Sequence, residues 1–401
     1  MDEGSRLWSK DFILSSLINF FFAFVFYLLI VTTSGYAVEV YGASTGEAGL
    51  VSSIFSIGAL LGRLLLGPYM ERIGYKKMLM SSIVLFILIS CFYFIHLNIG
   101  FLLLTRFLHG MMLGLTMMIV NAMVAHIIPA GRKGEGIGYY SLSTIFATAF
   151  GPFLGILLIH SISFELLFAG CIGLSLCSLF VASFIKSPVI NIVPAPMERF
   201  SLKKYIEPRA VPISLVVLVT AFCYSSVLTY LSFYATQLNL VKTASLFFIT
   251  YSIAILLSRP FTGKLLDRKG ANYVMYPAII LFAIGMFILS IADNSTLFLL
   301  SSVFIGLGFG NIQSCAQAIS VNCVPPEKIG LSTATNSNFM NVGLGFGPYL
   351  LGTMLGSFSY SQMYAGLSVI ILLTVILYTM IYAKPEKKGL MISNARELGV
   401  K

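Results

Sequence analysis

Charged side chains are scarce in this sequence, since Asp, Glu, Lys and Arg together make up 10% of its 401 residues. Soluble domains usually carry about 25% charged residues. Hydrophobic residues reach 58%, which would leave a water-soluble protein with too little polar surface. These proportions exclude an ordinary soluble domain and indicate a chain that folds in a lipid bilayer.

Several signatures of chemistry are also missing. The sequence has no Gly-x-x-x-x-Gly-Lys-Ser/Thr loop for a nucleotide, no His-Glu-x-x-His pair for zinc and no Cys-x-x-Cys pair. Its six cysteines lie in or at the ends of apolar runs, which is typical of small packing residues. We therefore expect neither an ATP-driven pump nor an enzyme, and we expect no metal or other cofactor.

The basic residues predict an orientation. A net charge of +10 would fit a nucleic-acid-binding protein, but the Lys and Arg residues are dispersed at the ends of apolar runs rather than clustered. In membrane proteins such residues mark the cytoplasmic side. With the N-terminus inside, 23 of the 25 fall on the inner side, and Lys242 and Arg106 are the exceptions. We predict a multi-pass protein of the cell membrane with both termini in the cytoplasm and no nucleic-acid partner.

Twelve apolar runs approach the roughly 20 residues that a membrane-spanning helix needs. They begin near residues 12, 46, 78, 100, 136 and 164 and, after a polar interval, near 210, 243, 273, 296, 329 and 361. We predict an all-α membrane protein with twelve transmembrane helices. Its parts would be an N-terminal six-helix bundle (1–186), a cytoplasmic linker (187–209) and a C-terminal six-helix bundle with a short cytoplasmic tail (210–401).

The two predicted bundles share residues at a constant offset of 196 positions. Both begin on the inner side, so the repeat is parallel, with a pseudo-two-fold axis along the membrane normal. Such a design indicates transport by alternating access, in which two similar bundles rock against each other. The matching pairs are Arg63 and Arg259, Gly67 and Gly263, Glu71 and Asp267, Arg72 and Arg268, Gly74 and Gly270, Gly110 and Gly306, Gly114 and Gly310, Pro129 and Pro325, and Gly151-Pro152 and Gly347-Pro348.

The repeated loop resembles a motif of the major facilitator superfamily. The stretch 67–77, GPYMERIGYKK, is similar to the family's signature between its second and third helices, and 263–270 is similar to the degenerate second copy. Glu71 stands where the family usually has Asp. The resemblance implies a conformational latch at the inner face, although such basic loops also simply set orientation. The latch residues would be Gly67, Glu71, Arg72, Gly74, Lys76, Asp267 and Arg268.

Two further stretches extend the resemblance over the whole chain. RFLHG, starting at Arg106, resembles the family's fourth-helix motif, and GPFLG, starting at Gly151, resembles the fifth-helix motif of its twelve-helix drug–proton antiporters, an efflux permease branch. Proline within a helix removes a hydrogen bond and permits a kink, and glycine allows close helix contact. We interpret Gly151, Pro152, Gly155, Gly347 and Pro348 as a kink in the fifth and eleventh helices, either a generic bend or a seal that supports switching.

Arg106 is the strongest single candidate for a functional residue. An arginine near the centre of a membrane helix costs about 2.5–3.5 kcal/mol on insertion scales. It would therefore face the protein interior with a partner, and the resemblance implies proton or substrate coupling; the alternative is an arginine that reaches the interface. His109 lies three residues on and is either a proton carrier or a packing histidine. Glu39 would join them if the first helix runs long.

Polar and aromatic residues on the predicted first, fourth, seventh, tenth and eleventh helices are candidate contacts for a solute. Each could instead form a helix–helix hydrogen bond. As a set they indicate a largely neutral, aromatic-rich cavity suited to an amphipathic organic molecule. They are Asn19, Tyr27, Asn121, Tyr224, Tyr230, Asn311, Gln313, Gln317 and Asn338.

Three functions compete for this sequence. The first is a secondary transporter that exports small amphipathic organic molecules or drugs in exchange for protons. The second is an uptake permease or proton symporter for a sugar-like or other small metabolite. The third, a non-transporting membrane sensor or enzyme, would need a soluble domain or clustered catalytic residues, and neither is evident. We favour the exporter, with a small-molecule substrate, protons and the lipid bilayer as its partners, and the family resemblance implies that it acts as a monomer.

Overall fold

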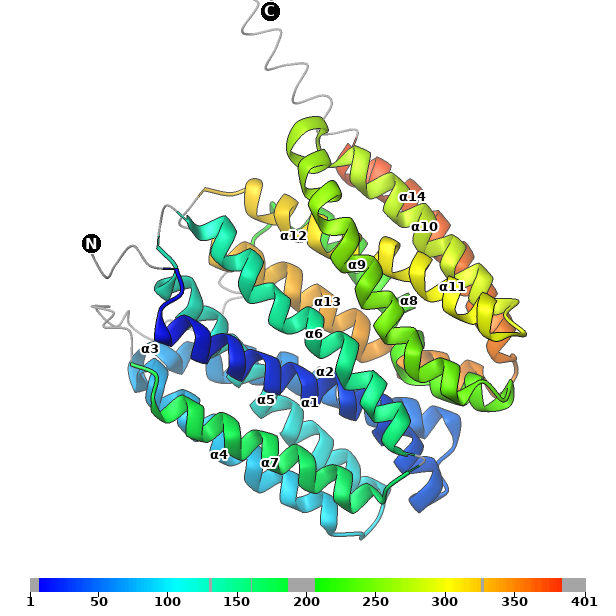
Figure 1. Cartoon of the computed structure of the whole chain (residues 1–401), viewed down its shortest axis with the longest axis horizontal. Coiled ribbons are helices and arrows are strands. Elements are labelled where there is room, and N and C mark those ends of the chain that lie inside the picture. The colour runs from blue at the N-terminus through cyan, green and yellow to red at the C-terminus, as the bar shows by residue number, and fades with distance from the viewer. Residues whose placement is uncertain (1–6, 130–131, 160, 187–205, 326–327, 384–401) are drawn as a thin grey trace, which may run out of the picture. The chain divides into compact units, whose positions relative to one another are not determined.

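The computed structural model describes residues 7–129, 132–159, 161–186, 206–325 and 328–383. Over these ranges the chain is helical and contains no strand (Figure 1). The helices of spanning length begin within three residues of the positions predicted from hydropathy. Among the described residues, 11 helices are long and apolar enough to cross a membrane. The chain is thus an all-helical, multi-pass membrane protein.

One predicted span differs from the others. Helix α13 (Ile329–Met354) has 26 residues, enough to cross a bilayer, but it is not among the 11 apolar helices. Its sequence is rich in Ser, Thr, Asn and Gly, which lowers its hydropathy. Polar residues in a membrane helix usually face protein or a water-filled cavity rather than lipid. The count of twelve spans therefore stays a prediction.

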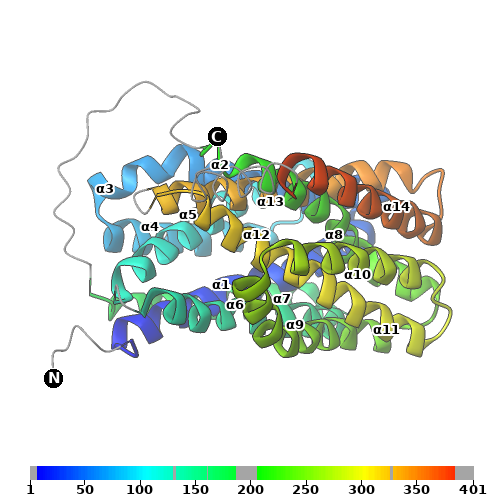
Figure 2. The same cartoon turned by 90° about the horizontal axis from the view of Figure 1, so that it is seen from above.

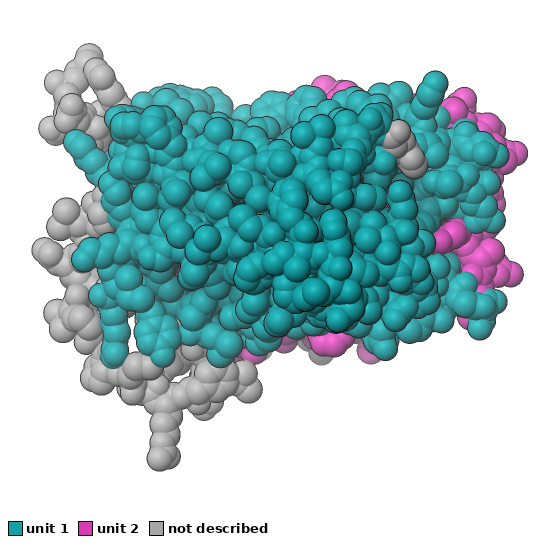
Figure 3. Space-filling view, turned by 90° about the horizontal axis from the view of Figure 1, so that it is seen from below, with its two compact units in different colours: residues 1–199, 228–252, 348–357 teal, residues 200–227, 253–347, 358–401 magenta. Residues whose placement is uncertain are grey.

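The chain separates into two compact units (Figure 3). Unit 1 comprises residues 1–199, 228–252 and 348–357, and unit 2 comprises residues 200–227, 253–347 and 358–401. Helices α8 (Val211–Gln237), α9 (Val241–Lys269) and α13 each contribute to both. The bundles predicted from the repeat have different boundaries and stay a prediction, and most of the predicted linker (187–205) lies outside the described residues.

Unit 1 is built on close helix packing. Helix α1 packs along α6 and α7, and α2 packs along α5 (Figure 1). A Cβ atom at Gly110 or Gly114 of α5 would collide with the carbonyl oxygen of Phe55 or Ala59 of α2. Glycine lets the two backbones touch. The helices are α1 (Lys10–Tyr41), α2 (Thr45–Leu66), α3 (Met70–Ile73), α4 (Tyr75–Ser90), the 3-10 helix η3 (Cys91–Phe94), α5 (Ile99–Ile127), α6 (Lys133–Ile159) and α7 (Phe164–Ser183).

Unit 2 has α10 against α11 and α14 (Figure 2). A Cβ at Gly308 would collide with the backbone nitrogen of Phe282. Gly308 lies in a short π-helical segment that interrupts one long helix, and such segments occur often at functional sites. The helices are α10 (Asn272–Ser290), α11 (Ser295–Ile305), the π segment η6 (Gly306–Gly310), α12 (Asn311–Asn322), α14 (Tyr360–Tyr378) and the π segment η8 (Thr379–Ala383).

Two ends of unit 1 can be distinguished by its connections. The basic end carries the connections at 67–74 and 184–186 and the described connecting residues 128, 129 and 132, and the opposite end carries the connections at 42–44 and 95–98. At the opposite end, Ser44 and Glu47 cap α2 with a reciprocal pair of hydrogen bonds. At the basic end, Gly74 has φ 91°, and in unit 2 its repeat partner Gly270 has φ 88°. Only glycine adopts this conformation without strain, which explains why both copies of the motif keep it.

Candidate functional site

Arg106 of α5 is completely buried within unit 1. Its Nε donates to the carbonyl oxygen of Val51 on α2 at 3.2 Å, and its Nη1 donates to the hydroxyl of Tyr93 at 3.4 Å. The guanidinium lies 4.2 Å from the centre of the Phe55 ring, a cation–π contact. Within the described residues no carboxylate pairs with it, and its Nη2 has no hydrogen-bond partner. A buried cation is thus held by neutral groups.

His109 lies one turn further along α5 and is also completely buried. Its Nδ1 is 3.1 Å from the Tyr93 hydroxyl, and its Nε2 is 2.9 Å from Ser90 Oγ. The ring stacks on Phe86 with a centroid distance of 3.9 Å. Tyr93 therefore joins Arg106 to His109, and the five residues Arg106, Tyr93, His109, Ser90 and Phe86 form one network, which we call the Arg106 network.

Sequence reasoning identified two members of the Arg106 network and missed three. Tyr93, Ser90 and Phe86 sit in a run that hydropathy treats as one apolar helix. The signal available was indirect, because a buried arginine must find partners on the helices that face it. Glu39, the third predicted coupling residue, is exposed in the last turn of α1. The structure does not bring it to the Arg106 network.

The predicted latch residues lie at helix ends. At the basic end of unit 1, Lys76 Nζ donates to the carbonyl oxygen of Ser183 at the C-terminus of α7 at 2.8 Å. This bond satisfies one of the free carbonyls at that end and places a cation where the helix dipole favours it. In unit 2, Asp267 and Arg268 are exposed near the end of α9. The side chain of Glu71 lies outside the described part of the chain.

The predicted kink residues are packing residues in both units. In unit 1, a Cβ at Gly151 would lie 3.0 Å from the carbonyl oxygen of Phe24 on α1, and one at Gly155 would lie 2.8 Å from Val31 Cγ2. In unit 2, a Cβ at Gly347 would collide with Ser225 Oγ on α8. Helices α6 and α13 continue through Pro152 and Pro348 as single helices.

Several predicted solute contacts form helix–helix hydrogen bonds. Asn19 Nδ2 on α1 donates to Ser143 Oγ and Thr144 Oγ1 on α6 at 2.6 and 3.0 Å. Asn311 Nδ2 donates to Ser258 Oγ on α9 at 3.0 Å. Gln313 Nε2 lies 3.2 Å from Met340 Sδ, and Asn338 is half-buried on α13. The two tyrosines contact other aromatic rings. Tyr224 stacks on Phe309 with a centroid distance of 4.1 Å, and Tyr27 contacts Phe26 edge-on at 4.9 Å.

One hydrogen bond recurs in both units at the offset of 196. In unit 1, the Tyr140 hydroxyl on α6 donates to Asn121 Oδ1 on α5 at 2.6 Å. In unit 2, Asn336 Nδ2 on α13 donates to Gln317 Oε1 on α12 at 3.0 Å. Each pair joins the helices that the sequence places fourth and fifth in its repeat. The repeat is therefore preserved in side-chain contacts, although the residue types differ.

At the opposite end of unit 1, segments distant in sequence come together. The Tyr230 hydroxyl on α8 donates to the carbonyl oxygen of Pro348 on α13 at 2.5 Å, and the carbonyl oxygen of Thr45 is 3.3 Å away. The backbone N–H of Tyr349 donates to Ser53 Oγ on α2 at 2.9 Å. These contacts fasten the backbone of α13 at Pro348 and Tyr349 to α8 and α2.

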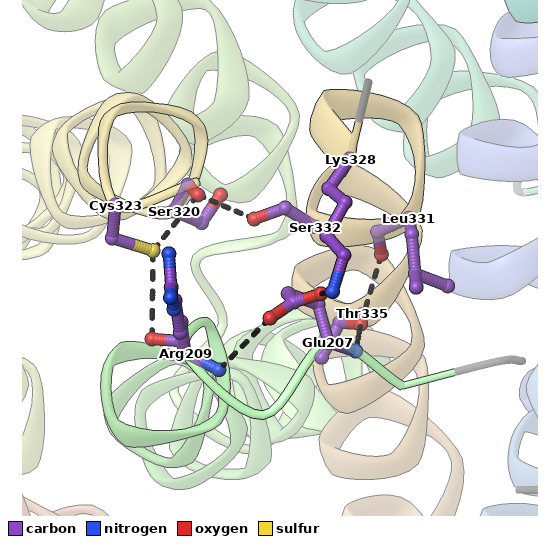
Figure 4. A network of polar contacts seen from close by, with 8 residues as sticks. All are labelled: Glu207, Arg209, Ser320, Cys323, Lys328, Leu331, Ser332 and Thr335. Atoms are coloured by element: carbon purple, nitrogen blue, oxygen red, sulfur yellow. Dashed lines mark hydrogen bonds and ion pairs between the residues drawn. The ribbon is translucent and has the colours of Figure 1, made fainter. Parts of the chain in front are cut away.

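A buried carboxylate holds the start of α8 in unit 2 (Figure 4). The Glu207 side chain is 3% exposed, and its Oε2 lies 3.2 Å from Lys328 Nζ. Its backbone N–H donates to Thr335 Oγ1 at 2.8 Å, and the Cys323 thiol donates to the carbonyl oxygen of Arg209 at 3.4 Å. Sequence reasoning assigned Glu207 to the linker and missed this cluster, which ties that segment to α12 and α13.

Comparisons with known proteins identify the family. A family model described as Major Facilitator Superfamily matches residues 15–250 and 241–398, so the chain belongs to this superfamily of transporters. It is 24% identical to multidrug resistance protein 2 of Bacillus subtilis over 90% of this chain and 93% of that protein. It is 22% identical to the quinolone resistance protein NorA of Staphylococcus aureus over 88% and 92% of the two chains.

Solved structures show the same fold. The nucleoside transporter NupG superposes with a TM-score of 0.70 at 14% identity, covering 93% of this chain and 98% of NupG. The human organic anion transporter MFSD10 superposes with a TM-score of 0.70 at 15% identity, covering 92% and 98%. At such low identity these likenesses define the fold and not the substrate. The chain resembles efflux permeases of the superfamily in sequence.

Proposed function

We propose that the protein exports small amphipathic organic molecules or drugs in exchange for protons by alternating access. The observation that carries this proposal is the near full-length similarity to a protein named for multidrug resistance, over 90% of this chain and 93% of that relative. The buried Arg106 also supports a transport role. An arginine without a carboxylate partner among the described residues is costly in a bilayer, and such residues usually serve a function.

The proposal includes the arrangement predicted from sequence. It comprises twelve helices in two six-helix bundles (1–186 and 210–401) related by a parallel pseudo-two-fold axis, a cytoplasmic linker (187–209), cytoplasmic termini and a monomer in the cell membrane. The repeated Tyr140–Asn121 and Asn336–Gln317 hydrogen bonds support the internal repeat. The protein would move its solute without covalent change and would not act as an enzyme.

Roles for individual residues follow from their positions. We assign proton coupling to Arg106 and His109, with Glu39 as an outer acid. The inner-face latch would comprise Gly67, Glu71, Arg72, Gly74, Lys76, Asp267 and Arg268. Gly151, Pro152, Gly155, Gly347 and Pro348 would serve the close packing on which switching depends. Asn19, Tyr27, Asn121, Tyr224, Tyr230, Asn311, Gln313, Gln317 and Asn338 would contribute to the solute path.

The test is a flux assay with purified protein in vesicles of defined pH gradient. A panel of fluorescent cationic, neutral and anionic amphipathic solutes would be offered, and intravesicular pH would be followed at the same time. The expected result is that solute and protons move in opposite directions. Solute movement would then dissipate the imposed pH gradient. Solute transport that is indifferent to the gradient would refute proton exchange.

An uptake permease is the alternative. Its support is limited to the fold, which the chain shares with the nucleoside transporter NupG at a TM-score of 0.70. The same vesicles distinguish the two functions, because a symporter moves solute and protons in one direction. Co-directional fluxes of a sugar-like solute and protons would favour the permease and overturn the exporter.

A further inference from the structure

The hydrogen bonds of the Arg106 network have one arrangement that satisfies the Tyr93 and Ser90 hydroxyls and both ring nitrogens of His109. A guanidinium has N–H donors and no acceptor, so the Tyr93 oxygen accepts from Arg106 Nη1. Tyr93 is 3% exposed, and among the residues that the structure describes its hydroxyl proton then has one acceptor within reach, His109 Nδ1. Ser90 donates its own proton to the carbonyl oxygen of Phe86 at 2.7 Å, so its oxygen accepts from His109 Nε2.

The opposite tautomer of His109 leaves groups unsatisfied. With the proton on Nδ1, the Tyr93 oxygen would face two donors, and its own buried hydroxyl proton would lose its acceptor. Nε2 would then need a proton from Ser90, which would give up its bond to Phe86. Buried unpaired donors are costly. The neutral Nε2–H tautomer is therefore the one that these contacts select.

A positively charged His109 fits these contacts no better. It would donate from both ring nitrogens, and its Nδ1–H would point at the same Tyr93 oxygen that accepts from Arg106. The titratable and charged groups near this histidine are Arg106 and Tyr93, and the buried thiol of Cys171 on α7 lies close to those two residues. None of them carries a negative charge at neutral pH that would stabilise a second cation beside the guanidinium.

The repeat shows that the scaffold does not require this network. At the offset of 196, Arg106 corresponds to Ser302, His109 to Ile305, Tyr93 to Leu289 and Ser90 to Met286. All four counterparts are buried in unit 2, so the equivalent place is filled by one small and three apolar side chains. Phe86 has Phe282 as its counterpart. The same packing position is filled without a buried charge in unit 2.

We propose that Tyr93 is a positioning residue that holds Arg106 in place and keeps His109 as the neutral Nε2–H tautomer. His109 then contributes to the proposed proton coupling as a hydrogen-bond acceptor that orients Tyr93, and not as the proton carrier that the sequence left open. The Tyr93 ring is itself fixed, because it stacks on Phe168 of α7 at 4.5 Å with an interplanar angle of 13°. The coupling role of Tyr93 rests on the proposed function. The tautomer of His109 rests on the hydrogen bonds alone.

The first experiment reads the tautomer directly. Nitrogen-15 NMR of histidine-labelled full-length protein distinguishes neutral Nε2–H, neutral Nδ1–H and charged imidazole, and the His109→Gln variant assigns the signal. We expect a neutral Nε2–H signal that persists as the pH falls through the usual range of histidine titration. In Tyr93→Phe we expect that signal to change, because Nδ1 loses its donor. A charged or Nδ1–H His109 in the unaltered protein would overturn the inference.

The second experiment compares gradient-driven export with solute exchange at equal pH on both sides. We expect Tyr93→Phe to lower gradient-driven export about tenfold, the equivalent of about 1.4 kcal/mol lost from one charge-assisted hydrogen bond, while exchange is retained. Tyr36→Phe is the matched control, since its ring is 1% exposed and lies outside the Arg106 network. Equal losses of export and exchange, or unchanged export, in Tyr93→Phe would contradict the positioning role.

The two experiments fail separately. If the unaltered protein shows no proton-driven export, the proposed function fails while the NMR result still decides the tautomer. If export is proton-driven and His109 is neutral at Nε2–H, but Tyr93→Phe couples normally, the coupling role of Tyr93 fails alone. Unchanged thermal unfolding of Tyr93→Phe and Tyr36→Phe would show that neither result comes from misfolding.

Discussion

The Tyr230 hydroxyl on α8 lies 2.5 Å from the carbonyl oxygen of Pro348 on α13, and both residues belong to unit 1. Close packing makes this contact possible, because a Cβ at Gly49 of α2 would collide with both groups. Ser53 adds a bond from α2 to the backbone of the next residue, Tyr349. If the two proposed bundles rock against each other, the contacts of α2 with α8 and α13 at this end form and break in each cycle.

Tyr230→Phe should loosen this end of unit 1. Loss of one buried hydrogen bond corresponds to about 1 kcal/mol, or about a fivefold shift in population. Val40 on α1 and Thr353 on α13 are both exposed. Spin labels on cysteines at these two positions would report the distance between the two helix ends by double electron–electron resonance. Thr229→Val is the control, since its buried hydroxyl has no hydrogen-bond partner among the described residues. An identical distance distribution in Tyr230→Phe would remove the hydroxyl from the conformational balance.

A disulfide should lock the same end. A Cβ at Gly46 would lie 3.5 Å from Thr353 Cγ2 and 3.8 Å from Thr353 Cα, which is compatible with disulfide geometry. We expect the Gly46→Cys, Thr353→Cys double variant to cross-link under mild oxidation and to stop transport until a reductant is added. Each single variant serves as a control. Full transport by the cross-linked protein would show that this end does not open.

Replacement of Arg106 should uncouple transport. Arg106→Lys keeps the charge but cannot donate to both Val51 and Tyr93 from one rigid fork, so we expect gradient-driven export to fall by about one to two orders of magnitude. Arg106→Ala should reduce it to background. Export in vesicles and the amount of inserted protein would be measured together. Ser302→Ala, at the equivalent position of the repeat, is the control and should transport normally.

Breaking the Glu207 ion pair should destabilise unit 2. Lys328→Met leaves a carboxylate that is 3% exposed without its cation, so we expect a loss of about 1–3 kcal/mol in stability. Glu207→Gln removes the charge itself and should cost less. Thermal unfolding of both single variants and the double variant gives the interaction energy. If Lys328→Met is no worse than Glu207→Gln, the pair contributes no net stability.

Cys323 reports on the same cluster. Burial raises the pKa of its thiol, and its carbonyl partners keep it as a hydrogen-bond donor. A raised pKa means less thiolate at neutral pH, so alkylation should be slow there and should accelerate with pH over a higher range than for a free thiol. In Lys328→Met we expect faster labelling as the segment loosens. Cys323→Ser identifies the labelled site, and labelling as fast as that of a free cysteine would contradict the partly buried, hydrogen-bonded thiol.

Hydropathy and sequence spacing predicted much of this fold. The helices of spanning length begin within three residues of the predicted positions, because a bilayer demands long apolar runs and satisfied backbone groups. The paired glycines Gly74 and Gly270 were predicted to be equivalent and share a positive φ. Helix α13 fell short of the apolar criterion because its Ser, Thr, Asn and Gly residues lower its hydropathy, and two of them, Asn336 and Thr335, bind Gln317 of α12 and the backbone of Glu207.

The site was less predictable than the helices. Arg106 and His109 were predicted to lie on one helix face, and the structure places both against Tyr93. Glu39 was predicted as a possible third member, yet it is exposed at the end of α1. Asn19 could have faced solute or another helix, and it binds α6. Such choices depend on which faces meet, and helix periodicity does not specify the partner.

The sequence by itself determined the membrane environment, the positions where the spanning helices begin, the internal offset of 196 and the family. These follow from hydropathy and from residue types at fixed spacing, which are local properties of the chain. The tertiary structure decided that Arg106 has neutral partners, that Tyr93 links it to His109, and that Tyr230 reaches the backbone beside Pro348. These depend on side chains from separate helices meeting at hydrogen-bond distance, which packing alone determines.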